Sequence, residues 1–155
     1  MSKIVHRETI PLRATPEQVR QFIMTPERIL DYYPNGVEGA VLEQGERLYC
    51  RSKSGVSLLE RLAGESSDEK VVIEVTTALN LKPPYTVERI KAARFFTMIE
   101  DWELEATDEG SLLTKTWRDV HKYRLRLMPI VFLVRRGAKA ETVHLQSAWN
   151  EAAAG

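Results

Sequence analysis

A charged pair flanked by two tryptophans is the part of this sequence best suited to bind a ligand. Pairing of two strands around a loop at 107–110 would place Trp102 opposite Lys115 and Glu100 opposite Trp117. Side chains alternate between the two faces of a strand, so Lys115 and Trp102 would share one face, with Glu100 as the diagonal neighbour of Lys115. An ammonium and a carboxylate between two indole rings would form a polar anchor in an apolar cavity.

A second interpretation of the same pair needs no cavity. Lys115 and Glu100 could lie near the ends of their strands and reach solvent through their flexible chains. Because Lys and Glu are seldom fully buried, we favour this solvent-exposed arrangement. In the buried arrangement, Lys115 or Glu100 would form the polar end of the cavity, and the walls would come from Met98, Trp102, Trp117, Phe132 and Trp149.

The other reactive side chains form no pattern typical of catalysis or metal binding. His6, His121 and His144 have no spacing typical of zinc ligands, and Cys50 is the single cysteine. His121 could act as a general base if it faced the cavity, but such a histidine needs a positioned partner and the sequence offers none. The sequence also lacks a glycine-rich phosphate loop and a nucleophile elbow. We therefore predict no metal and no cofactor, and we assign no catalytic residue.

The composition argues against several classes of protein. A length of 155 residues predicts a single domain over 1–155. The 22 basic and 22 acidic residues cancel, which argues against a dedicated nucleic-acid binder. One cysteine excludes an internal disulfide and is typical of a reducing compartment, and the N-terminus lacks the apolar core of a signal peptide. We expect a soluble cytoplasmic protein, and the sequence leaves its oligomeric state open.

The last thirty residues predict the helix around which the other elements are arranged. Apolar side chains recur after Ala138 at the three- and four-residue steps of one helix face: Leu145, Ala148, Trp149 and Ala152. Pro129 and Gly137 both disfavour a helix interior. We therefore expect an irregular or separately oriented segment over 123–137, which could gate a cavity, and a firm helix only from about Ala138.

Turn signals divide the rest of the chain into short elements. Thr15-Pro16-Glu17-Gln18 predicts a capped helix near 16–24, and Thr25-Pro26 predicts a second one over 26–33. Pro83-Pro84 cannot belong to a central strand, so we expect a long loop over 80–92. Short breaks between β-rich runs indicate an antiparallel meander. The predicted strands are 3–13, 37–43, 46–53, 56–65, 70–79, 93–106 and 111–121.

This order of elements resembles the START-like helix-grip superfamily, or SRPBCC-type proteins. The superfamily includes polyketide cyclases/dehydrases, lipid-transfer domains and plant pathogenesis-related ligand binders. The resemblance covers nearly the whole chain and depends on ATPEQVRQFI, YYPNGVEGAVLEQG and EDWELEATDEGSLLTKTW. It implies an α+β helix-grip fold, in which a seven-stranded antiparallel sheet curves around a long C-terminal helix, with two short helices between strands 1 and 2. These motifs are fold signatures, and the activities found on the fold are diverse.

The resemblance implies a binder or carrier of a hydrophobic small molecule, lipid-like or polycyclic, held between the C-terminal helix and the sheet. We lean towards this non-enzymatic function. One alternative is an enzyme resembling the polyketide cyclases/aromatases, which an acid–base residue deep in a roomy cavity would favour. Another is a protein-interaction module with a closed cavity, which a sealed, side-chain-filled interior would favour.

A group of basic residues flanks the apolar run MPIVFLV near the start of the predicted C-terminal helix. On an exposed surface, this combination would give transient contact with an anionic membrane. We favour the alternative in which the apolar residues close the cavity while the arginines stay in water, because the apolar run has to fill a core. The basic residues are Lys122, Arg124, Arg126, Arg135, Arg136 and Lys139.

Overall fold

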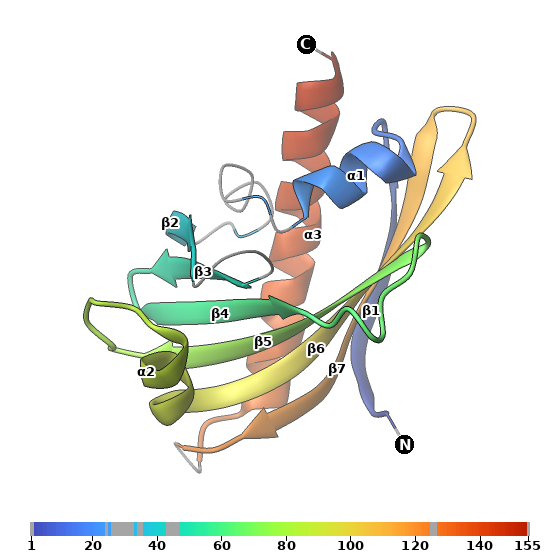
Figure 1. Cartoon of the computed structure of the whole chain (residues 1–155). Coiled ribbons are helices and arrows are strands. Elements are labelled where there is room, and N and C mark those ends of the chain that lie inside the picture. The colour runs from blue at the N-terminus through green and yellow to red at the C-terminus, as the bar shows by residue number, and fades with distance from the viewer. Residues whose placement is uncertain are drawn as a thin grey trace.

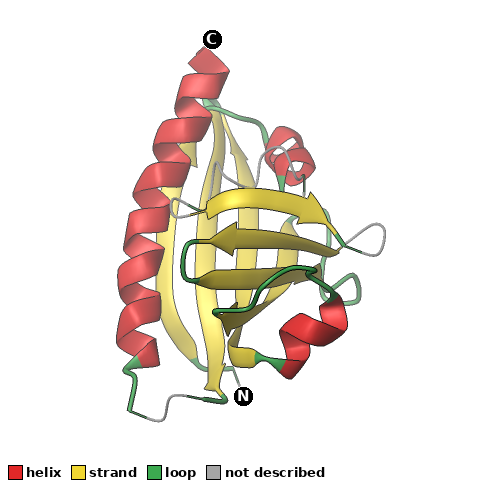
Figure 2. Ribbon diagram, turned by 90° about the vertical axis from the view of Figure 1, so that its left-hand side faces the viewer, coloured by secondary structure: helices red, strands yellow, loops and turns green. Residues whose placement is uncertain are grey.

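The computed structural model shows one curved antiparallel sheet of seven strands, with the long helix α3 (Ile130–Ala154) lying along it (Figure 1). Figure 2 shows α3 along one side of the molecule and the short helices α1 (Pro16–Phe22) and α2 (Val87–Ala92) towards the opposite side. Side chains are described as far as residue 148. The structure describes residues 2–23, 25, 33, 36–42, 47–124 and 127–154.

The strand order confirms the predicted antiparallel meander. Neighbours in the sheet run β1-β7-β6-β5-β4-β3-β2, so the first strand closes the meander beside the last one. Each strand overlaps its predicted range, because the turn residues between them were the strongest local signals. The strands are β1 (Ile4–Leu12), β2 (Gly36–Val41), β3 (Arg47–Ser52), β4 (Gly55–Arg61), β5 (Lys70–Leu79), β6 (Arg94–Thr107) and β7 (Gly110–Lys122).

The start of α1 confirms the predicted capping box. The Thr15 hydroxyl accepts a hydrogen bond from the Gln18 backbone N–H at 3.2 Å, and the Gln18 side chain accepts one from the Thr15 N–H at 2.8 Å. These reciprocal bonds satisfy two backbone donors that a helix start leaves unpaired. The second helix predicted over 26–33 lies outside the described residues, apart from Tyr33.

The prediction of a loop throughout 80–92 was wrong, because α2 occupies its second half. Thr86 caps this helix by accepting a hydrogen bond from the Arg89 N–H at 3.1 Å, and Glu88 lies in the first turn, where a negative charge is favourable. Pro83-Pro84 does exclude a strand here, as predicted. The capping signal at Thr86 was present in the sequence but was outweighed by the two prolines.

The predicted break in the C-terminal helix was also wrong. Helix α3 begins at Ile130 and continues through Gly137 to Ala154. Pro129 lies just before the first turn, where a missing N–H removes no helical hydrogen bond. Gly137 costs roughly 1 kcal/mol relative to alanine, but its neighbours Val134 and Ala138 are buried against the sheet and offset that cost. Within the described part of the chain, no helix is both long and apolar enough to span a bilayer.

The hydrophobic core lies on both faces of the sheet. On one face, Leu145 of α3 and Val19 of α1 belong to the same buried cluster as Leu59 of β4. On the other face, Ile90 of α2 clusters with Leu58 of β4. Because consecutive residues of a strand point to opposite faces, α2 and α3 cover opposite sides of the sheet. The candidate site lies on the α3 side.

Candidate ligand-binding cavity

A cavity of about 480 Å³ lies between the first half of α3 and the sheet. Its wall is mainly apolar and aromatic, and it is partly open to solvent. Residues from β3 to β7 contribute to the sheet side, so the cavity spans most of the width of the curved sheet. Representative wall residues are Phe96, Met98, Trp117, Leu133, Val134 and Ala138.

A buried charge cluster lies next to the cavity and joins three elements. Lys115 of β7, Glu100 of β6 and Glu141 of α3 have exposed fractions of only 3%, 0% and 6%. The Lys115 ammonium lies in direct contact with both carboxyl groups. The Tyr33 hydroxyl donates a hydrogen bond to the second Glu100 oxygen, Oε2, at 2.9 Å. Each polar group of this cluster therefore has another member of the cluster as its partner.

The predicted register of the β6–β7 hairpin is confirmed, with Trp102 opposite Lys115 and Glu100 opposite Trp117. Our preference for a solvent-exposed Lys115 and Glu100 was wrong. The two side chains lie on the face that α3 covers, and the Glu141 carboxyl supplies a second partner for the ammonium. This compensation makes the burial of a lysine tolerable.

The two tryptophans hold the ammonium between their rings. The Lys115 Nζ atom lies 4.1 Å from the ring centroid of Trp102 and 4.7 Å from that of Trp117. A cation near the face of an indole ring gains up to about 2 kcal/mol when it is desolvated. Lys115 is thus bound by two carboxyl groups and two aromatic rings. Little of it remains for contact with a ligand.

Glu141 is the acid–base group of the cavity. It lines the cavity wall, and burial raises the pKa of its carboxyl to about 8; the Lys115 ammonium opposes this rise and the Glu100 carboxylate adds to it. A hydrogen bond from the Trp117 indole also favours the ionised form. At neutral pH the Glu141 carboxyl is therefore mostly protonated. It can donate a proton to a molecule in the cavity, or take one from it.

The predicted site residues separate into four groups. Met98 and Trp117 line the cavity, and Glu100, Trp102 and Lys115 are buried directly beside it. The placement of Phe132 in the wall was wrong, since its side chain is 60% exposed. Phe132 comes two residues before the buried Val134. Side chains two positions apart in an α-helix point in nearly opposite directions. The side chain of Trp149 lies outside the described residues.

The most important residue that the sequence analysis missed is Glu141. It lies three residues after Ala138 and four before Leu145, so it interrupts the apolar stripe of the helix. A carboxylate at a core position requires a buried partner, and that conflict was a usable signal. Tyr33, the hydrogen-bond donor to Glu100, is a second residue that was not predicted to belong to the site.

The remaining candidates for chemistry lie apart from the acid–base group or are inert. His121 is exposed and stacks edge-on against Tyr123 at 4.5 Å between ring centroids. Cys50 is buried, and burial raises the pKa of its thiol to about 12, with a smaller contribution from Glu141. The thiol is therefore neutral and behaves as a small hydrophobic side chain.

Comparisons with known proteins identify the fold but no sequence relative. No family model and no curated protein sequence matches the chain. A conserved protein from Geobacillus kaustophilus has a TM-score of 0.68 at 14% identity, over 99% of this chain and 95% of its own. A START superfamily protein from Mycobacterium smegmatis has a TM-score of 0.60 at 14% identity, over 96% of this chain and 95% of its own. DynU16, from the dynemicin biosynthetic locus, has a TM-score of 0.57 at 12% identity, over 91% of this chain and 45% of its own. These structures confirm the predicted START-like helix-grip fold.

Proposed function

We propose that this START-like chain binds or carries a hydrophobic small molecule, lipid-like or polycyclic, in the cavity between α3 and the sheet. The cavity is the observation that supports the proposal. Its volume of about 480 Å³ falls in the range of small-molecule sites, which are mostly apolar with a few polar groups. Burial of the molecule's apolar surface would supply the binding free energy at about 25 cal/mol per Å².

Native mass spectrometry of the protein purified from its own host tests this proposal. A co-purified hydrophobic molecule that leaves on denaturation is the expected result. Titration with a neutral naphthalene derivative, followed by its fluorescence, tests the empty protein in the same way. A protein that carries no such molecule and binds no apolar probe would contradict cavity binding. It would favour the alternative of a protein-interaction module with a closed cavity.

Proton-transfer catalysis of the polyketide-cyclase type is a second candidate function. Glu141 favours it, because a general acid or base works best when its pKa is near the working pH. The protonated carboxyl could donate to a carbonyl or hydroxyl oxygen of a bound chain, and the carboxylate could then remove a proton elsewhere. Either activity requires the cavity to bind its molecule first. Catalysis would be recognised by a product whose formation Glu141→Gln slows at least a hundredfold.

We also propose transient contact with an anionic membrane at the end of the molecule where α3 begins. Part of the apolar run expected to fill the core is instead exposed there, with exposed fractions of 95% for Leu127 and 60% for Phe132. Val131 and Leu133 are exposed as well. Apolar side chains at the surface beside a cavity could enter the outer part of a bilayer.

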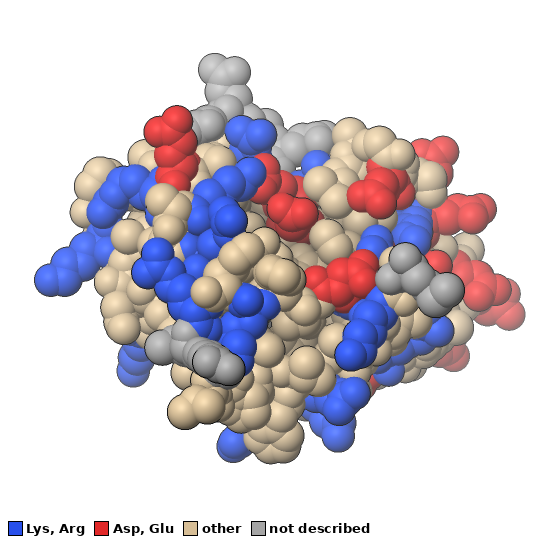
Figure 3. All heavy atoms as spheres, turned by 90° about the horizontal axis from the view of Figure 1, so that it is seen from below, with Lys and Arg blue, Asp and Glu red and all other residues tan. Residues whose placement is uncertain are grey.

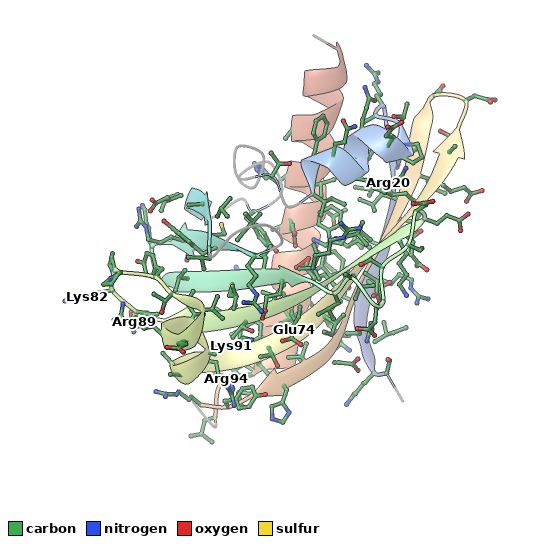
Figure 4. The ribbon with its side chains drawn as sticks, in the orientation of Figure 1. Arg20, Glu74, Lys82, Arg89, Lys91 and Arg94 are labelled. Carbon is green, nitrogen blue, oxygen red and sulfur yellow. The ribbon has the colours of Figure 1, made fainter. Side chains whose placement is uncertain are left out.

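Basic side chains surround this apolar end. Figure 3, a view from below, shows lysines and arginines gathered on one part of this face. Figure 4 places Lys82, Arg89, Lys91 and Arg94 on and around α2. A shallow hollow there is lined by Lys91, Arg94 and Arg124. This grouping would suit the phosphates of anionic lipids.

Vesicle sedimentation at low salt tests membrane contact. The double variant Arg124→Glu/Arg136→Glu should lose at least tenfold in affinity for phosphatidylglycerol vesicles, since each basic residue near the surface contributes about 1 kcal/mol. Arg124 donates a hydrogen bond to the Ala92 carbonyl, so the melting temperature of the double variant is measured beside its vesicle binding. Arg20→Glu, far from α2 in Figure 4, is the control for net charge; it changes the charge by half as much as the double variant does. If the unmodified protein does not sediment with these vesicles, membrane contact is excluded.

A further inference from the structure

Building on the cavity binding proposed above, we infer that the cavity selects a hydrophobic amine, bound as its ammonium ion beside Glu141, and rejects hydrophobic carboxylates. Three features of the site support this preference: the order in which its charges face the cavity, the charge balance of the cluster and the aromatic wall.

The order of charges places a carboxyl group at the cavity wall. Glu141 lines the cavity, whereas Lys115 and Glu100 are buried behind the wall and do not line it. The Lys115 ammonium is already paired with both carboxyl groups and lies against Trp102 and Trp117. An incoming molecule therefore meets Glu141 first. An anionic group there would lie next to two carboxyl groups in a medium of low polarity, where like charges repel strongly.

The charge balance of the cluster leaves room for one more cation. Lys115 supplies one positive charge, and Glu100 and Glu141 together can supply two negative ones. In the empty cavity a proton on Glu141 neutralises the excess, because burial raises the pKa of this carboxyl to about 8. An ammonium group can replace that proton and leave the cluster neutral. Binding of the amine should therefore release one proton from the protein.

Other polar groups near Glu141 contribute less to this exchange. From β3, Cys50 faces it as a neutral thiol. Tyr33 points its hydroxyl at Glu100, as a hydrogen-bond donor. On β1, the imidazole of His6 stacks on Trp117 at 5.5 Å between ring centroids and lies 2.7 Å from a Glu8 oxygen. His6 is therefore varied as a control.

The aromatic part of the wall suits the same class of ligand. Phe95, Phe96 and Trp117 line the cavity together with Glu141. Aromatic faces attract a cation and also pack against its apolar body. The proposed ligand is thus a primary or secondary amine on an aromatic or aliphatic body small enough for the cavity.

Three probes with one apolar body test the inference directly: 2-naphthylmethylamine, 2-naphthylmethanol and 2-naphthoate. At pH 7, the amine should bind the wild-type protein at least tenfold more tightly than the alcohol, and the carboxylate at least tenfold more weakly. The amine's affinity should rise about tenfold between pH 6 and pH 7 and level off above about pH 8, since only the ionised fraction of Glu141 is competent to bind it. Calorimetry in buffers of different ionisation enthalpy should show one proton released per amine bound.

Two variants test whether the preference for the amine and its pH dependence come from Glu141. Glu141→Gln mimics the protonated carboxyl and should reduce the ratio of amine to alcohol affinity by at least tenfold, with loss of its pH dependence. His6→Gln should keep both the ratio and the pH dependence. The proton-release measurement uses the wild-type protein, so it decides the question even if Glu141→Gln does not fold.

The possible failures are distinguishable. If the alcohol binds but the carboxylate binds more tightly than the amine, or the amine releases no proton, then the cavity binds apolar molecules and the inferred preference for amines is wrong. If His6→Gln abolishes the pH dependence, Glu141 is not the proton donor and the inference also fails. If none of the three probes binds, the proposed cavity binding itself is contradicted.

Discussion

Replacing Lys115 with methionine tests whether the buried ammonium stabilises the charge cluster. Methionine keeps the length of the side chain and removes its charge, so Glu100 loses its cationic partner while remaining inaccessible to solvent. Removing one partner of a buried ion pair typically costs about 3–5 kcal/mol. With the urea dependence usual for small domains, that loss would lower the unfolding midpoint by roughly 2 M.

Urea unfolding at pH 7, followed by tryptophan fluorescence and circular dichroism, measures this effect. The double variant Glu100→Gln/Lys115→Met removes both charges and should recover at least half of the lost free energy of unfolding. Arg51→Met breaks the solvent-exposed ion pair with Glu38 and should leave the unfolding midpoint nearly unchanged. A Lys115→Met protein as stable as the wild type would show that the ammonium does not compensate a buried carboxylate.

Three further predictions follow from other parts of the site. The pKa of Glu141 is raised to about 8 from an ordinary value near 4.5, so the contribution of this carboxyl to stability is complete below about pH 4.5 and is lost as the pH rises through 8. Glu141→Gln should therefore flatten the fall in melting temperature between these pH values. An unchanged slope would refute the raised pKa of Glu141. Burial raises the pKa of the Cys50 thiol to about 12, so Cys50 should react with Ellman's reagent only at the rate of unfolding, and rapid labelling of the native protein would contradict this. A Cβ atom at Gly137 would meet no other atom within 4 Å, so Gly137→Ala should raise the free energy of unfolding by up to about 1 kcal/mol in urea titrations, whereas a loss would indicate an unrecognised close contact.

The sequence predicted local geometry well, because strand pairing follows from a few nearby residues. Turn signals and the period-two pattern were enough to place Lys115 opposite Trp102. They could not show burial, because the group that makes burial possible, Glu141, lies on α3 and is brought to Lys115 only by tertiary structure. Solvent exposure depends on which element covers a face, and a pattern within one strand does not contain that information.

The two errors in helix placement have a common physical origin. Local propensity argued against a helix at Gly137 and around Pro83-Pro84. Packing of Val134 and Ala138 against the sheet outweighs the first penalty, and a new cap at Thr86 begins a helix just after the second. Propensity is a weak guide wherever a helix gains an apolar surface to cover. The gate expected over 123–137 loses its basis from residue 130 onwards, where α3 is continuous.

The contact between the Lys115 ammonium and the Glu141 carboxyl also restricts how α3 can slide along the sheet. The apolar stripe of the helix repeats about every turn, so a shift of one turn, about 5.4 Å, would still bury apolar side chains. The same shift would carry the Glu141 carboxyl away from Lys115 and leave both groups buried without each other. An apolar interface alone would tolerate such slippage, whereas buried polar groups that lose their partners penalise it. The cluster therefore fixes one alignment of helix and sheet, and with it the shape of the cavity between them.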